Sequence, residues 1–174
     1  SIATEKVEID KQLVGIVGAV TGEVKTNTRD LKTGDKIYLN ETILAGIESG
    51  TQILLLDQST FTIGSESEVI MDTFIYDPAT NDGKIVASVK QGSLKIISGL
   101  ISKKNPDSLT VKVPEGTLGS RGTEFQTMVS KKQTRVLACQ LMALSRLKFI
   151  YILILKVVKY EKAHSRLKIA YTPV

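Results

Sequence analysis

The sequence predicts an all-β domain, built as a compact β-solenoid or roll, or as a sandwich, of about ten short strands. Through the first 130 residues, short runs rich in Val, Ile, Leu, Thr and Phe alternate between apolar and polar residues with a period of two. That period is the spacing of a strand with one buried face. Gly, Asn and Asp separate the runs, and none of the runs has the spacing of an amphipathic helix.

Turn residues place the first strands of the expected domain. The turn-like residues 31–35 precede a strand at residues 36–39, and Asn40-Glu41 precedes a strand at residues 42–44. Residues 53–56 read Ile-Leu-Leu-Leu. Because this run is apolar at every position, it predicts a strand that is covered on both faces.

The later strands are predicted together with the residues that face the core. Residues 77–83 contain an Asp-Gly pair, which tolerates the positive φ angles of a tight turn, so they predict a hairpin loop. Gln91-Gly92 and Ser98-Gly99 divide the strands that follow. The residues expected to face the core are Val69, Met71, Thr73, Ile85, Ala87, Val89, Leu109, Val111, Val113, Phe125, Thr127 and Val129.

The composition of the chain changes near residue 130. Residues 131–174 contain ten Lys or Arg residues and one acid, whereas residues 1–130 contain 13 bases and 17 acids. All 13 glycines lie at or before Gly122. We therefore divide the chain into a β domain at residues 1–130 and an atypical basic, apolar tail at residues 131–174. Since the net charge of +5 comes from the tail, it does not indicate a nucleic-acid partner, and we expect none.

The tail is expected to be irregular or part-helical. Leu137, Leu141, Leu144 and Leu147 have helical spacing, so they predict a helix in its first half, and the second half reads as a β run. The uncharged apolar residues 149–155 are bracketed by Lys148 and Lys156. A membrane-spanning helix needs about 20 apolar residues. No transmembrane segment is therefore expected in this chain.

Three glycines surround one arginine in residues 113–125, VPEGTLGSRGTEF, which invites comparison with a phosphate-binding loop. The glycine spacing matches no nucleotide-binding pattern, and a strand-like run follows where a helix would be needed. The stretch predicts instead a strand, a bend permitted by glycine and a second strand, with Pro114 at a strand end or edge. Arg121 is expected to anchor the bend through backbone carbonyls or a carboxylate.

Groups for catalysis or metal binding are scarce. The single Cys139 and the single His164 exclude an intramolecular disulfide and a Cys/His zinc cluster, and they disfavour Ser-His-Asp and Cys-His mechanisms. Residues 77–82 lack the ligand order of a calcium loop, so a solvated hairpin end is expected there. A pair of catalytic carboxylates, as in glycosidases, stays open as an alternative. The acids that could form such a pair are Asp57, Glu66, Glu68 and Asp72. We expect no cofactor, no metal and no enzyme activity.

Four segments follow one another in a specific order: LKTGD, DQS, KQGSLKII and VPEGTLGSRGTEF. This succession resembles the FecR-type domain of bacterial envelope proteins over about residues 16–129. That family usually has glycine at the centre of the Asp-Gly-Ser turn, where this chain has Gln58. The residues of the closing motif, which are structural and candidates for interaction, are Pro114, Gly119, Arg121, Gly122, Thr123 and Phe125.

The resemblance implies a non-enzymatic, periplasmic or otherwise exported sensor or interaction module, which binds a protein or another envelope component. In the sensors that name the family, such a region relays the occupancy of an outer-membrane iron-siderophore transporter to a cytoplasmic sigma factor. A link to signalling or to the regulation of iron uptake is therefore implied. The alternative is a structural or assembly domain of a larger exported surface protein, and an enzyme ranks third.

The family also has further alternating strands after the closing motif. This chain keeps Thr134-Arg135-Val136-Leu137 and then loses glycine, acids and alternation together. The loss leads to the hypothesis that a reading-frame shift begins near residues 137–139, so that the rest of the tail is not in the natural frame. Resequencing the locus tests it, and an error-free frame through codon 174 would contradict it.

Overall fold

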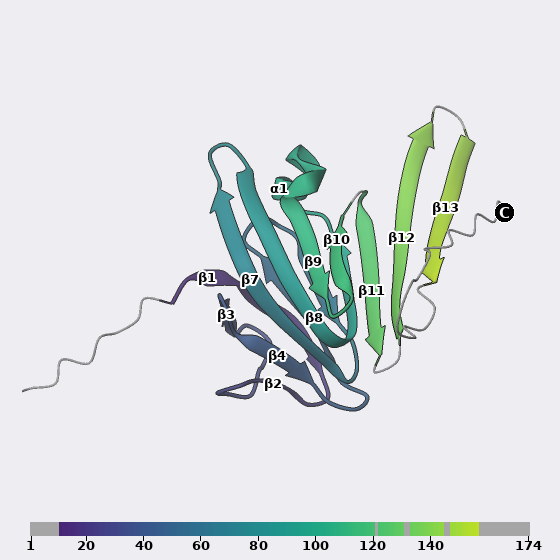
Figure 1. The fold of residues 1–174 in the computed structure, drawn as a ribbon. Helices are drawn as coiled ribbons and strands as arrows, with labels where there is room; N and C mark the ends of the chain where they lie inside the picture. Colours follow the sequence, from purple (N-terminus) through teal and green to yellow (C-terminus); the bar gives the residue numbers. More distant parts are fainter. Residues whose placement is uncertain (1–10, 121, 131–132, 145–146, 157–174) are drawn as a thin grey trace, which may run out of the picture.

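The computed structural model describes residues 11–120, 122–130, 133–144 and 147–156, and for the last two ranges it describes the backbone alone. The described chain forms one curled, mostly antiparallel sheet with a single short α-helix (Figure 1). Its elements are β1 (Leu13–Thr21), β2 (Val24–Thr26), β3 (Lys36–Tyr38), β4 (Thr42–Ala45), β5 (Gly50–Leu55), β6 (Thr60–Ile63), β7 (Ser67–Asp77), β8 (Asp82–Ile97), α1 (Leu100–Lys104), the 3-10 helix η1 (Pro106–Ser108), β9 (Leu109–Val113), β10 (Gly116–Gly119), β11 (Glu124–Ser130), β12 (Gln133–Leu144) and β13 (Leu147–Lys156). The predicted all-β class is confirmed.

Strand β8 belongs to both halves of the curled sheet. Its first part pairs with β7 and β9, in the half that continues to β4, β2 and β10. Its last part pairs with β6 and β11, in the half that contains β5, β1, β3, β12 and β13. The strand changes partners at Gly92, which has a φ of +84°. A Cβ there would lie 2.4 Å from the Cα of Ser67, so the bend requires glycine.

One apolar core lies between the two half-sheets. Phe61, Leu94 and Ile96 from one half and Ile43, Ile85 and Leu109 from the other are all buried in the same cluster. Each such side chain stabilises the fold by about 1.5–3 kcal/mol when it leaves water. Because residues of both halves fill the same core, neither half has an apolar core of its own.

The residues predicted to face the core do so with one exception, although Val113 is only partly buried. Val86 and Ser88, which the alternation places on the outer face of β8, are buried as well. Residues 85, 87, 89, 109 and 111 are buried as expected, and Phe125, Thr127 and Val129 are buried on one face of β11. Thr73 is not buried, because the register of β7 against β8 shifts between Met71 and Thr73. The irregularity moves the core position to Phe74, which is 2% exposed.

The prediction that residues 53–56 are covered on both faces is wrong. Leu54 and Leu56 are 47% and 45% exposed, whereas Ile53 and Leu55 are buried. Leu54 lies directly opposite Ile16 of β1, which is itself 42% exposed. The outer face of this half-sheet therefore presents exposed apolar side chains, which the continuous apolar run had assigned to the interior.

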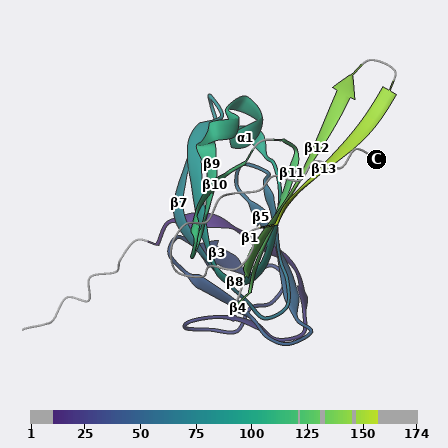
Figure 2. The same ribbon diagram turned by 45° about the vertical axis from the view of Figure 1, so that its right-hand side comes forward.

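The helix predicted for the first half of the tail is also wrong. Residues 133–144 form β12, which pairs with β11 from Ser130↔Gln133 to Glu124↔Cys139. The edge of β11 offers backbone hydrogen bonds to an extended chain, and this pairing overrides the helical spacing of the leucines. The β run expected for the second half is β13 (Figure 2), which pairs only with β12 among the described residues. Residues 157–174 lie outside the described ranges.

Beyond Cys139 the β12–β13 ribbon extends past the end of β11 and away from the body of the domain (Figures 1 and 2). Within the described ranges, no helix has the length and apolar character needed to cross a membrane.

Candidate functional site: a signature junction and the sheet edges

The turn between β5 and β6 holds the start of α1. The carboxylate of Asp57 is fully buried, and its Oδ2 accepts hydrogen bonds from Ser59 Oγ at 2.8 Å and from the Ile101 N–H at 3.3 Å. The main-chain carbonyl of Asp57 accepts from the Leu100 N–H at 2.7 Å. Two of the N–H groups that a helix leaves unsatisfied at its start thus meet the oxygens of one residue.

Ser98 and Gly99 connect this turn to the closing motif. The Gly99 N–H donates to Ser59 Oγ at 3.0 Å. Ser98 donates from its N–H to Thr123 O and from its hydroxyl to Gly122 O, both at 2.9 Å. We call this group of six residues the signature junction: Asp57, Ser59, Ser98, Gly99, Gly122 and Thr123. A Cβ on Gly99 would lie 2.3 Å from Asp57 O and from Ser59 N. Because both are backbone atoms, the junction has no room for a side chain at that position.

The six residues singled out in the closing motif divide among different structural roles. Pro114 is exposed and directly follows β9, in the turn of a β9–β10 hairpin, and Gly119 is the exposed last residue of β10. Gly122 (φ +119°) and Thr123 join the signature junction, whereas Phe125 is 4% exposed in the core. Arg121 lies outside the described residues, so its role stays a prediction. The expected bend and second strand are present, and the hairpin before them was missed.

The acidic loop at residues 77–82 ends the β7–β8 hairpin, as predicted. Asp77 accepts hydrogen bonds from the Ala79 N–H and the Thr80 hydroxyl, which occupy one oxygen each. The ammonium of Lys104 lies 2.7 Å from Asp82 Oδ1. Lys104, aided by Thr80, holds the pKa of Asp82 below its ordinary value of 3.8. Within the described ranges, no three His, Cys, Asp or Glu side chains gather in a way that could hold a metal ion.

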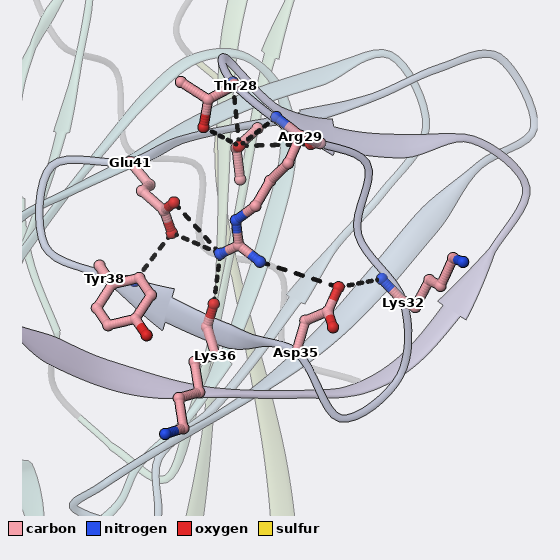
Figure 3. Close-up of polar contacts among 8 residues, drawn as sticks. Thr28, Arg29, Lys32, Asp35, Lys36, Tyr38 and Glu41 are labelled. Atoms are coloured by element: carbon pink, nitrogen blue, oxygen red, sulfur yellow. Dashed lines mark hydrogen bonds and ion pairs between the residues drawn. The ribbon is translucent and has the colours of Figure 1, made fainter.

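Side chains close the outer edge of β3 (Figure 3). In an antiparallel strand, successive residues direct their backbone N–H and C=O groups to opposite edges. Asp35 O accepts a hydrogen bond from the Val17 N–H of β1, and the Leu39 N–H donates to Gln12 O. Lys36 and Tyr38 therefore direct their backbone groups away from β1. Arg29 Nη2 donates to the Lys36 carbonyl, and the Tyr38 N–H donates to Glu41 Oε2 at 2.9 Å.

Arg29 and Glu41 also bind each other, with Nη2 at 3.2 and 3.1 Å from the two carboxylate oxygens. We call Arg29 and Glu41 the edge clamp. The pair satisfies the Lys36 carbonyl and the Tyr38 N–H of the edge strand, and the contact between Arg29 and Glu41 fixes both side chains. Sequence reasoning missed it because side chains that cap a strand edge have no periodic spacing.

The chain also closes the outer edge of β2. The loop after β2 folds back on the strand, so that the Leu31 N–H donates to Val24 O at 2.9 Å and the Thr26 N–H donates to Arg29 O at 2.7 Å. These bonds use the backbone groups that β2 directs away from β4. An incoming strand would find no free backbone group at Val24 O or at the Thr26 N–H.

The outer edge of β10 is open. The Ser120 N–H donates to Leu109 O at 3.2 Å, which fixes Gly116 and Leu118 as the β10 residues that exchange hydrogen bonds with β9. Thr117 and Gly119 therefore direct their N–H and C=O groups away from β9, and no described backbone group pairs with them there. Both residues are exposed, and a Cβ on Gly119 would meet nothing within 4 Å.

Comparison with known proteins finds one family. A family model described as FecR protein matches residues 41–140, which is more than half of the chain. The match begins at Glu41 of the edge clamp and includes the signature junction and the β9–β10 hairpin. Neither a curated protein nor a solved structure matches the chain.

Proposed function

Because the chain belongs to the FecR family, a regulatory family associated with the bacterial envelope, we propose that it is a non-enzymatic sensor or interaction module of the envelope. It acts in the periplasm or in another exported location and binds a protein or another envelope component. The observation that carries this proposal is the family match over residues 41–140. The open edge of β10, in a sheet whose β2 and β3 edges are closed by the chain itself, supports it. A link to signalling or to the regulation of iron uptake is the finer part of the proposal.

The roles of the signature residues support a scaffold more than a reaction site. Asp57 is the most buried acid of the described residues, and its carboxylate oxygens accept hydrogen bonds from Ser59 and from the start of α1. Gly122, Thr123 and Phe125 hold β11 against the junction and the core. The motif thus fixes the position of the β9–β10 hairpin, and Pro114 and Gly119 lie at its two exposed ends.

Binding and turnover measured on the same protein test the proposal. The full chain is immobilised and exposed to envelope extract of the source cells, and bound components are quantified after washing. The matched control is a Gly99→Ala protein, in which the junction cannot form. We expect saturable retention by the wild-type chain alone, with no turnover of a panel of glycosides, esters and peptides. Hydrolysis that a single Asp→Asn change abolishes would refute the proposal.

A second candidate function is assembly within a larger surface protein. The exposed apolar residues Ile16, Leu54 and Leu56 favour it, because an apolar sheet face can stack against a neighbouring domain. The complete gene distinguishes the two. Long repeats on either side of this domain support assembly, whereas a cytoplasmic helical region followed by a membrane span supports the sensor.

A further inference from the structure

We propose that the open edge of β10 is a strand-acceptor site, which binds an extended segment of a partner protein by β-augmentation. The inference rests on the proposed function and names its binding surface and the kind of partner it takes. The acceptor consists of the N–H and C=O groups of Thr117 and Gly119. These four groups are spaced for the backbone of one extended chain.

The contrast with the β2 and β3 edges carries the argument. The outer edge of β13 is also unpaired among the described residues, but β13 lies on a ribbon that leaves the domain, whereas β10 is joined through β9 to β8 in the core. Free strand edges invite unwanted pairing, and proteins commonly block them. This chain uses the edge clamp on β3 and a folded-back loop on β2. Residues 116–119 have none of these protections, since they read Gly-Thr-Leu-Gly, without charge and without proline. Their register against β9 runs without a shift, so no bulge turns the edge away.

The geometry also sets the chemistry of the bound segment. Leu118 is partly buried against the core, and it lies opposite the fully buried Val111. A segment added beside β10 places alternate residues on that same inner face. Those residues should be apolar. The residues between them lie beside exposed Thr117 on the outer face, where polar side chains are suitable.

A second copy of this chain is a poorer occupant. Two β10 strands paired about a two-fold axis would share only four residues each. A stable interface buries about 1,200–2,000 Å², which a contact between two four-residue strands does not approach. A flexible partner segment fits this edge better, because one extended strand can pair with four residues without bringing a second folded surface against the domain.

The first test uses a capped synthetic peptide, Thr-Val-Thr-Val-Thr-Val, as the probe and the full chain as the receptor. Binding is followed by fluorescence anisotropy and by amide shifts in NMR spectra. The control peptide has the same sequence with N-methyl groups on alternate residues, which removes the N–H groups of one edge. We expect saturable binding of the first peptide, at least tenfold weaker binding of the second, and shifts centred on residues 116–120. No binding, equal binding, or shifts centred on other strands would overturn the proposal.

Two variants test the edge itself. Thr117→Pro removes an N–H that points away from β9 and leaves the β9–β10 hydrogen bonds of Gly116 and Leu118 intact. Thr117→Ala is the matched control, because it keeps the N–H. We expect the proline variant to bind the probe at least tenfold more weakly and the alanine variant to stay within twofold, with thermal midpoints within about 2 °C of wild type.

The outcomes separate the two proposals. If Thr117→Pro binds the probe as wild type does, or still retains the envelope component, the acceptor site is refuted and the proposed function stands. If wild-type protein retains no envelope component, the proposed function fails whatever the peptide does. A concentration-dependent dimer that Thr117→Pro abolishes would identify a second copy as the occupant and refute the partner segment.

Discussion

Gln58 sits in a backbone conformation that suits glycine better. It is the central residue of the turn at residues 57–59, and its φ is +67°. Its side chain is exposed, and its backbone N–H donates to Leu55 O at 3.0 Å. The FecR family usually has glycine at this position, and the conformation supplies the physical reason. We therefore predict that Gln58→Gly stabilises the domain.

The expected size of the gain follows from two opposing terms. A residue with a Cβ in the left-handed region costs about 1–2 kcal/mol relative to glycine. Glycine in turn loses about 0.5–1 kcal/mol more conformational free energy on folding. No contact of the exposed Gln58 side chain offsets either term. The net gain is about 0.5–1 kcal/mol, which raises the melting temperature of a domain of this size by about 1–4 °C.

Urea and thermal unfolding, followed by circular dichroism, measure this difference. The matched control is Gln52→Gly, which makes the same substitution at an exposed residue in the middle of β5. Because strand backbone does not need glycine, that variant should lose about 0.5–1 kcal/mol. If Gln58→Gly loses as much stability as Gln52→Gly, the positive φ at Gln58 is not a source of strain and the reasoning fails.

Three further predictions concern the junction, the clamp and the hairpin end. Gly99→Ala should lower the unfolding free energy by at least about 3 kcal/mol, because the added Cβ meets two backbone atoms. Urea titration measures the loss. The control, Gly119→Ala, should change the unfolding free energy by less than about 1 kcal/mol in the same titration. Glu41→Ala should lower the unfolding free energy by about 1–3 kcal/mol, because it leaves the Tyr38 N–H without its acceptor. The exposed edge should also promote aggregation, so that light scattering rises with protein concentration. A Glu41→Gln variant that aggregates equally would show that the acceptor oxygen is not what protects the edge. The lowered pKa of Asp82 means that its pairing with Lys104 stabilises the fold above pH 3.8 and is lost as the pH falls through the lower folded-state value. Asp82→Asn should therefore flatten the acid end of the stability curve, and an unchanged acid limb would contradict the ion pair.

Alternation alone predicted much of the fold, because it reports which face of a strand is buried. It succeeded at residues 109–113, where the strand is regular. It failed at Thr73, since a register shift depends on the partner strand and leaves no periodic signal. The prediction for Leu54 and Leu56 came from the continuous apolar run and failed for another reason, because the type of an apolar residue does not tell an exposed outer face from a core.

The candidate site was less accessible to sequence reasoning than the fold. The bend at Gly122 could be predicted from glycine, but its bond to Ser98 joins residues 24 positions apart. The open edge of β10 was beyond reach for another reason. Whether a strand has a neighbour on each side is a property of the whole sheet, and residues 116–119 contain no signal for it.

Strand β8 makes the domain a single cooperative unit. Separating either half-sheet from the core pulls on a strand whose other end is hydrogen-bonded in the other half. We expect slow amide exchange on both sides of Gly92 to be lost in one step, and we expect neither half to fold when expressed alone. The same continuity lies beneath the proposed acceptor, because β9, which carries β10, pairs with β8 itself. The binding free energy of a strand at β10 would therefore stabilise the entire domain against unfolding. Binding at β10 would then be measurable as slower amide exchange in strands far from the contact.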